Sequence, residues 1–210
     1  MLLWINGPFG GGKTQTAYEI HRRLPGSVVC DPEHAGFGLR RMLPPELRGD
    51  FQDLVSWRQG VVEVLDLALA RHDGVVIAPM TVTDSGYFAE TVGRLRELGH
   101  DVRHFTLLAE RETVLRRLRE RGLGQVLRFV AGKNAGLRRE SWAVQQLDHC
   151  LERLVRPEFA EHLWTDRTTV PKTADRIAVL AGLTLRPHHE GPLRTRLRQA
   201  GVGLRHIRFD

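Results

Sequence analysis

The sequence predicts a three-layer α/β fold whose central sheet has about five parallel strands. Short apolar runs alternate with amphipathic segments at helical spacing along most of the chain. A glycine-rich stretch, residues 7–14, joins the first apolar run to the first amphipathic segment. Strands of about four to eight residues that are separated by helices imply parallel pairing with right-handed crossovers. The chain of 210 residues suits one domain with a sizeable core.

Composition and charge narrow the class of protein. Hydrophobic residues make up 41% and charged residues 27%, as in soluble globular proteins. No apolar run approaches the length of about 18–20 residues that spans a bilayer, and residues 1–20 lack a secretory pattern, so we expect a cytoplasmic protein. The net charge of +6, mostly from arginine, suits nucleotide polyphosphate, nucleic acid or an anionic membrane surface without choosing among them. Cys30 and Cys150 lack metal-ligand spacing, which favours reduced core thiols.

The first elements follow from hydrophobic spacing and from chain breakers. Residues 2–6 form an apolar run that ends at the glycines and predict a strand. Residues 13–24 predict a helix, because Ala17, Ile20 and Leu24 recur at helical spacing before a Pro-Gly break. Residues 27–31 predict a second strand, which Pro32 ends.

The same alternation continues toward the end of the chain. The spacing predicts helices over 58–73, 85–98, 111–121 and 172–183. It predicts strands over 75–80, 102–109 and 163–166.

Two segments interrupt the alternation. Residues 122–145 mix glycine with Arg128, Lys133, Arg138 and Arg139, which suits a lid that carries cations. Residues 184–210 form a basic tail with six arginines. We therefore expect a nucleotide-binding domain over 1–183, with its lid, followed by the tail.

The glycine-rich stretch carries the strongest functional signal. Gly7, Pro8, Phe9, Gly10, Gly11, Gly12, Lys13 and Thr14 match the Walker A pattern G-x-x-x-x-G-K-[ST] in full. Glycines let backbone N–H groups turn toward a phosphate, and the helix that follows presents its positive dipole end to the same anion. Lys13 can reach the β- and γ-phosphates of ATP, and the Thr14 hydroxyl can bind Mg²⁺. Gln15, in the first turn of that helix, joins the predicted nucleotide-binding set. Because the match follows a strand and opens a helix, it predicts a P-loop NTPase fold.

A carboxylate stands where a small-molecule kinase would need a base. Asp31 ends the second predicted strand, at the sheet edge that also carries the phosphate loop. It can accept a proton from a substrate hydroxyl or help to hold Mg²⁺ through water, and Glu33 is a second candidate. The alternative is a turn-forming aspartate before Pro32. The third strand runs into Pro79, Met80 and Thr81 rather than a metal-binding Asp, with Asp84 the nearest carboxylate, which argues against a motor-type ATPase.

Arginines of the fourth βα unit are candidates for contact with the nucleotide. Arg117 and Arg121 are four residues apart, on one helical face, where they can stack on adenine and stabilise a transferring phosphoryl group. The alternative is a solvated helix in which Glu110, Glu112 and Glu120 pair with these arginines. The loop 166–171 is a positional candidate for contact with the base.

Two further segments have competing interpretations. Residues 36–57 carry several apolar side chains at the point where an acceptor-binding subdomain would be inserted. They suit either a partly apolar acceptor pocket or, with somewhat greater weight, an apolar helix packed into the core. The stretch "PHHE" (187–190) has no further ligand at useful spacing, which disfavours a metal site.

Taken together, these motifs resemble the tunicamycin-resistance ATP-binding protein family. The likeness is carried by "WINGPFGGGKTQTAYEIHRRLPGSVVCDPEHAGFGLRRMLPP" (4–45), "VVIAPMTVTD" (75–84), "RRLRERG" (116–122) and "LRTRLRQAGVGLRHIRF" (193–209). The arrangement is also similar to small P-loop kinases of the shikimate, gluconate and chloramphenicol phosphotransferase type.

The resemblance implies a function and a set of roles. The family resemblance implies an ATP-binding protein that counters the nucleoside antibiotic tunicamycin, in a family whose members have been linked to drug binding and membrane association. The kinase resemblance implies phosphorylation of a small-molecule hydroxyl. Matched by position, Lys13 and Thr14 take the phosphate and Mg²⁺ roles, Asp31 the acceptor-side carboxylate, and Arg117 the arginine that stacks on adenine. The lid arginines match only by region.

Several functions follow as hypotheses. The first is a kinase in which the phosphate loop binds MgATP, Asp31 deprotonates a hydroxyl of tunicamycin or a related nucleoside compound, and Arg121 stabilises the phosphoryl transition state. The alternative is a non-catalytic protein that sequesters tunicamycin in an ATP-dependent way. Nucleic-acid binding is disfavoured, because the cations are spread without interleaved aromatic residues. The tail suits either packing over the domain, which we favour, or peripheral contact with anionic lipid.

Overall fold

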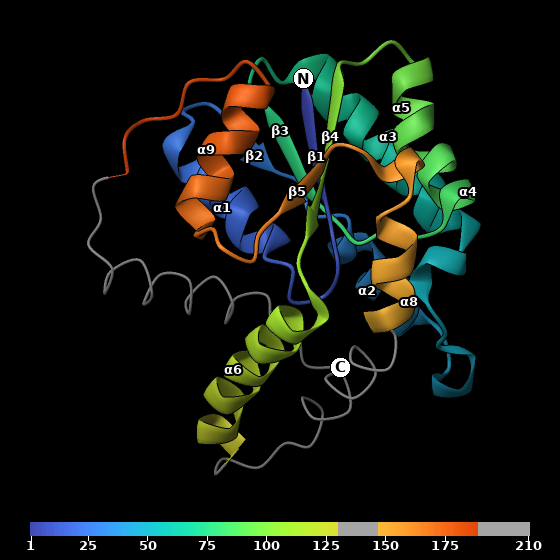
Figure 1. The fold of residues 1–210 in the computed structure, drawn as a ribbon. Helices are drawn as coiled ribbons and strands as arrows, with labels where there is room; N and C mark the ends of the chain where they lie inside the picture. Colours follow the sequence, from blue (N-terminus) through green and yellow to red (C-terminus); the bar gives the residue numbers. More distant parts are fainter. Residues whose placement is uncertain (130–146, 189–210) are drawn as a thin grey trace.

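The described chain is built on a sheet of five parallel strands with helices on both faces (Figure 1). The computed structural model describes residues 1–129 and 147–188, with side chains for 1–120 and 147–188. The strands are β1 (Leu2–Asn6), β2 (Val28–Val29), β3 (Val76–Pro79), β4 (Val102–Leu108) and β5 (His162–Trp164). Their order is β2-β3-β1-β4-β5, and every neighbouring pair is parallel. The predicted three-layer α/β fold is confirmed.

The helices fall into two layers. They are α1 (Lys13–Arg23), α2 (Glu33–Met42), α3 (Val55–Arg71), α4 (Ser85–Phe88), α5 (Arg94–Glu97), α6 (Arg111–Phe129), α8 (Leu147–Leu154) and α9 (Val170–Leu180). A π-helical turn, η3 (Ala89–Gly93), joins α4 to α5, and short 3₁₀ turns stand at η1 (Pro45–Leu47), η2 (Phe51–Asp53) and η4 (Pro157–Phe159). Figure 1 shows α1 and α9 on one side of the sheet, with α3, α4, α5 and α8 on the other.

The alternation of side chains along β1 divides the core between these layers. Leu3 and Ile5 pack in a cluster with Ile20 of α1 and Ile177 of α9. Leu2 and Trp4 point to the opposite face and pack in a cluster with residues of α3, η3 and α8. Because both faces are covered, the central strand is apolar from Leu2 to Ile5, and it ends at Asn6, directly before the phosphate loop.

The structure differs from the predicted elements most clearly in two helices, and β2 is shorter than the predicted strand 27–31. The helix that begins at Arg111 continues to Phe129, past its predicted end at residue 121, so glycines 122 and 124 lie within α6. The helix α8 was not predicted, although Leu147, Cys150 and Leu154 are buried at helical spacing. The remainder of the predicted lid, residues 130–145, lies outside the described residues.

The start of the predicted tail packs against α1. The Arg186 N–H donates to the Arg23 carbonyl (2.8 Å), and the Arg23 side chain donates back to the Arg186 carbonyl (2.7 Å). The buried Glu19 carboxylate lies 2.8 Å from Arg22 and 2.9 Å from the His188 ring. Residues 189–210 lie outside the described part of the chain. None of the helices within 1–129 and 147–188 is long and apolar enough to cross a membrane.

We expect two glycines of α2 to respond oppositely to alanine. A Cβ at Gly36 would lie 2.3 Å from the Phe51 ring, whose centroid is 5.4 Å from those of Phe37 and Trp57, whereas Gly38 faces open space. Gly36→Ala should therefore lower the free energy of unfolding by about 1–3 kcal/mol, and Gly38→Ala should raise it by about 0.5–1 kcal/mol. Urea unfolding of both variants measures the difference. Equal stability of the two would contradict the packing of Phe51 on α2.

His104 should make the protein less stable in mild acid. Burial in β4 lowers the pKa of His104 to about 4, although the Ala160 carbonyl, 2.8 Å from Nδ1, opposes the shift. The unfolded state therefore binds a proton that the folded state excludes between about pH 6.5 and 4, so stability is lost as the pH falls through this window. From about pH 7 to 5 the loss is about 2 kcal/mol. His104→Asn should reduce the pH dependence of urea unfolding by that amount, and an unchanged slope would refute the assignment.

Candidate functional site

The phosphate loop forms a tight turn between β1 and α1. Gly12 has a φ of 91°, a left-handed conformation that glycine adopts without strain, and the Gly11 N–H donates to the Pro8 carbonyl at 2.9 Å. A Cβ at Gly7 would lie 2.6 Å from the Leu107 carbonyl oxygen. The loop therefore needs glycine both for its curvature and for its close contact with β4.

Lys13 opens α1 and lies over the loop. Its side chain is buried, and Nζ donates to the Pro8 carbonyl at 3.0 Å and stands 5.6 Å from the Phe9 ring centroid. The helix cap is Gly12, so no side chain caps the first turn, and this turn, which includes Thr14 and Gln15, contains no acidic residue. The N-terminus of α1, with its helix dipole, and a lysine thus meet at one point, an arrangement that suits an anion such as a phosphate.

The segment after β3 fastens the beginning of the loop. The buried Asn6 side chain donates to the Val82 carbonyl (2.9 Å) and accepts from the Gly7 and Val82 N–H groups (2.8 and 3.0 Å). The Thr81 hydroxyl donates to the Gly7 carbonyl at 2.8 Å. Sequence reasoning missed both residues. A polar residue at the end of an otherwise apolar strand, directly before the glycines, is the signal that could have indicated Asn6.

Asp31 lies beyond β2, at the same edge of the sheet as the phosphate loop. Its Oδ1 accepts from the Glu33 N–H at 2.9 Å, so its carboxylate forms the turn that starts α2. Asp84 serves as the cap of α4, where it accepts from the Gly86 and Tyr87 N–H groups. Asp84, the carboxylate nearest to the end of β3, thus serves as a helix cap.

Arg117 joins α6 to the loop after β5. It donates to the Thr165 hydroxyl at 3.0 Å and to the Thr165 carbonyl at 2.7 Å. Burial lowers the pKa of Arg117, while the charge of Asp166 opposes that shift. Because Thr165 directly precedes the loop 166–171 that was predicted to contact a base, Arg117 stands beside that loop. Asp166, the first residue of the loop, accepts from the Glu110 N–H at 2.9 Å.

The helix α6 also supports the phosphate loop. A Cβ at Gly10 would meet Val114 and Leu118 of α6 at 3.2 and 3.1 Å. Arg121 lies further along the same helix, and its side chain is outside the described part, as are the lid residues Arg128, Lys133, Arg138 and Arg139. Among the arginines that were predicted to contact the nucleotide, Arg117 is therefore the one whose side-chain contacts lie within the described part of the chain.

Both cysteines are free thiols, as the sequence favours. Burial raises the pKa of Cys150 in α8 to about 11, and the positive charge of Lys13 opposes the shift. Burial also raises the pKa of the half-buried Cys30. Within the described residues, no group of three or more His, Cys, Asp or Glu side chains could hold a metal ion.

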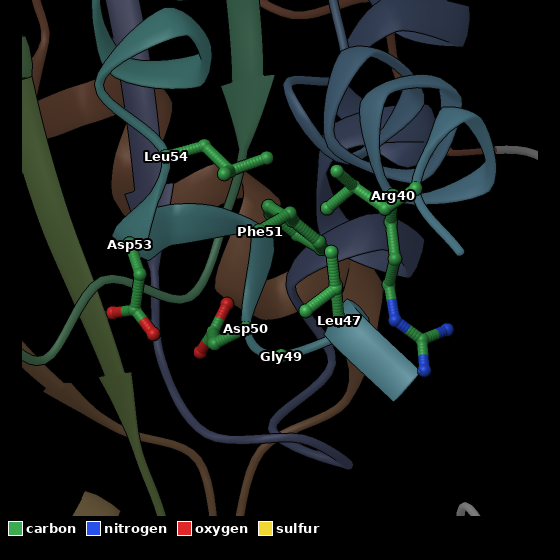
Figure 2. Close-up of a pocket in the computed structure, with 8 residues that line it drawn as sticks. Arg40, Leu47, Gly49, Asp50, Phe51, Asp53 and Leu54 are labelled. Carbon is green, nitrogen blue, oxygen red and sulfur yellow. The ribbon is translucent and has the colours of Figure 1, made fainter. Parts of the chain in front are cut away.

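The segment 36–57 packs partly on the core, as one predicted alternative has it, and partly lines a cavity. Its helix α2 packs on the core through Phe51 and Trp57, and Trp57 donates to the Pro32 carbonyl at 3.0 Å. A cavity of about 160 Å³ also lies beside α2 (Figure 2). It is lined by Arg40, Leu43, Leu47, Gly49, Asp50, Phe51, Asp53 and Leu54. The cavity walls are largely apolar, with charged groups at the rim.

The fold and the loop define a nucleotide-binding P-loop protein of kinase-like architecture. A family model described as an AAA domain matches residues 2–128. The tunicamycin resistance protein of Deinococcus radiodurans is 32% identical, with 89% of this chain and 99% of that chain covered and a TM-score of 0.70. The chain therefore belongs to the AAA-domain family and to the family of the tunicamycin resistance protein, as its motifs indicate.

More distant structures share the fold. Shikimate kinase from Bacteroides thetaiotaomicron is 17% identical, with 87% of this chain and 99% of that chain covered and a TM-score of 0.52. APS kinase from Mycobacterium tuberculosis is 14% identical, with 86% and 96% covered and a TM-score of 0.50. No curated protein sequence matches this chain at a significant level.

Removing the Thr81 hydroxyl should weaken nucleotide binding. Thr81→Val leaves the Gly7 carbonyl without its 2.8 Å donor, and the loop loses one tether. We expect the affinity for a fluorescent ATP analogue to fall about five- to tenfold, which corresponds to about 1–1.4 kcal/mol. Thr83→Val, two residues away, is the matched control and should change the affinity less than about twofold. Equal affinities in the two variants would argue against a role for this tether.

Proposed function

We propose that this protein is an ATP-dependent small-molecule kinase that phosphorylates a hydroxyl of tunicamycin or a related nucleoside compound. The observation that carries the proposal is the presence of a complete phosphate loop and Asp31 at one edge of the sheet. The segment after β3, where a motor-type ATPase has its acid, uses Thr81 to hold the loop and Asp84 to cap α4. The relationship to the tunicamycin resistance protein of Deinococcus radiodurans supports the choice of acceptor.

The phosphate loop and α1 would bind the nucleotide. Residues Gly7–Gln15 would surround the phosphates of ATP, with backbone N–H groups of the loop and of the start of α1 as donors. Lys13 would exchange the Pro8 carbonyl for a phosphate oxygen. The Thr14 hydroxyl would hold Mg²⁺, which supplies charge neutralisation at the phosphates when bound. Arg117, held beside the loop 166–171 by Thr165, would stack on the adenine ring.

Asp31 would act as the base. Its bond from the Glu33 N–H fixes the orientation of the carboxylate at the sheet edge. The acceptor hydroxyl would give its proton to Asp31 while its oxygen forms a bond to the γ-phosphorus, and ADP would leave with the electrons of the broken P–O bond. Arg121 and lid arginines would stabilise the charge of the transferring group.

A second candidate is ATP-dependent binding and sequestration of tunicamycin without transfer. The turn formed by Asp31 favours it, because this carboxylate has a structural task that needs no proton transfer. In that case the nucleotide would order the drug-binding side of the protein, and Lys13 would be required all the same.

The two candidates separate in one experiment. Purified protein is incubated with saturating labelled ATP and tunicamycin, and the drug is analysed for added phosphate by mass spectrometry. A kinase should yield phosphorylated drug, and Asp31→Asn should lower the rate about 10²–10⁴-fold with little change in ATP affinity. Asp73→Asn, an exposed carboxylate beyond α3, is the matched control and should retain the wild-type rate.

Two other outcomes would reject transfer. If no phosphorylated drug forms at saturating ATP and tunicamycin, the kinase proposal is rejected. Tight ATP-dependent binding of tunicamycin that survives Asp31→Asn, again without product, would support sequestration. Lys13→Ala should impair both activities and serves as a negative control.

A further inference from the structure

The cavity beside α2 has walls suited to an apolar group. Leu43, Leu47, Phe51 and Leu54 line it, and Figure 2 shows Leu47, Phe51 and Leu54 close together at its centre. Leu47 is 63% exposed, and Met42 (81%) and Val55 (52%), which adjoin the lining residues Leu43 and Leu54 in sequence, are exposed too. Apolar side chains that gather around a cavity and stay exposed are typical of a ligand site.

The shape of this cavity is set by contacts from other elements, which we call the Arg58 network. Arg58 of α3 is buried, donates to the Gln52 carbonyl and to Glu90 (2.6 Å), and lies 4.3 Å from the Tyr87 ring centroid. The Tyr87 hydroxyl in turn donates to Asp53 at 2.8 Å. These bonds hold both Gln52 and Asp53 of η2. The wall is therefore formed before any ligand arrives, so little ordering opposes binding.

The rim of the cavity is polar. Figure 2 shows the carboxylates of Asp50 and Asp53 on one side and the Arg40 guanidinium on the other. Burial raises the pKa of Asp50, while the bond from the Gln52 N–H opposes that shift. Carboxylates at the edge of an apolar cavity accept hydrogen bonds from hydroxyl or amide groups. A ligand that suits both features is an amphiphile whose apolar group begins next to hydroxyls.

Asp31 precedes α2, whereas the cavity lies beside the later part of this helix, with the lining residue Phe51 packed against Gly36. The Asp31 carboxylate is bonded to Glu33 at the start of this helix, while Arg40 and Leu43 line the cavity at its end. With a rise of about 1.5 Å per residue, Arg40 lies about 10 Å along the axis from Glu33. A compact acceptor held at Asp31 would leave the cavity empty, whereas an elongated one would reach both.

We propose that the cavity beside α2 binds an apolar group of the acceptor whose hydroxyl receives the phosphate. The assignment of that hydroxyl to Asp31 rests on the proposed function, whereas the cavity itself can be tested by binding alone. Its volume of about 160 Å³ is close to that of cavities that hold a benzene-sized group, so an apolar group of about six carbons would fill it.

The test uses butyl, hexyl and octyl glucoside as probes of the full chain, below their critical micelle concentrations, with isothermal titration calorimetry as the readout. Each methylene added between butyl and hexyl should raise the affinity about fourfold. The gain from hexyl to octyl should be smaller, because the cavity is then full. Equal affinity for the three probes would overturn the proposal.

Filling the cavity should remove the dependence of probe affinity on the length of the alkyl chain. Gly49 lines the cavity, and no atom lies within 4 Å of its Cβ position, so Gly49→Leu is chosen to fill the cavity. Hexyl glucoside should then bind no better than butyl glucoside. Gly60→Leu on α3, which also has open space and lies outside the lining, is the matched control and should retain the chain-length dependence. Identical behaviour of the two leucine variants would mean that the probes bind elsewhere.

A second pair of variants tests the wall without filling the space. Leu47→Gln should weaken hexyl glucoside binding about fivefold or more, since it removes apolar contact from the lining. Leu67→Gln, at a similarly exposed leucine of α3 (52%), should leave it unchanged. An equal effect of both would overturn the proposal.

The binding test of the cavity and the phosphorylation test of the kinase proposal can succeed or fail independently. Chain-length dependence that Gly49→Leu abolishes supports the cavity site even if the drug is never phosphorylated. If phosphorylated tunicamycin forms at wild-type KM in Gly49→Leu, the cavity does not contact the acceptor and the proposal fails while the kinase stands.

Discussion

The side-chain amide of Asn6 connects the end of β1 with the segment after β3, and the geometry of the phosphate loop depends on that connection. A buried amide without partners would cost about 1–3 kcal/mol, so its three hydrogen bonds fix where Gly7 and Val82 can lie. Thr81 adds a fourth bond to the same place. The loop therefore starts from a rigid junction of two strands, and its curvature is passed on to α1 with little freedom.

The proposed site divides into a nucleotide side and an acceptor side that are held by different contacts. On the nucleotide side, α6 packs under Gly10 through Val114 and Leu118, and Arg117 ties it to Thr165. On the acceptor side, the Arg58 network fixes η2 through a buried guanidinium and an aromatic ring. Both sides are thus preorganised around the sheet edge, which suits a reaction that depends on positioning.

Sequence reasoning reached the elements whose evidence is local. The glycines and Lys13, the apolar strands and the helical spacing of α1 and α9 are all properties of neighbouring residues, and they predicted the fold and the loop. Sequence reasoning failed where a contact between residues far apart in the chain determines the local structure. The bond from Asn6 to Val82 spans 76 residues, and the residues near Asn6 in the sequence do not indicate which residue it will bind. The helix α6 passes through its glycines to Phe129, although local propensity predicts an earlier end. Asp31 was predicted with two alternatives, and its turn to Glu33 is now observed while its role as a base stays a prediction.

The order of the sheet has a consequence for how the protein is made. The central strand β1 pairs only with β3 and β4 among the described strands, and both follow it in the chain by a long interval. At a synthesis rate of about 5–20 residues per second, Val82 is added about 4–15 seconds after Asn6. During this interval the glycine loop and an unpaired apolar strand are already present on the ribosome. The residues of the phosphate loop are thus synthesised early but take their folded shape late. Chaperones that shield β1 would act before the loop has folded.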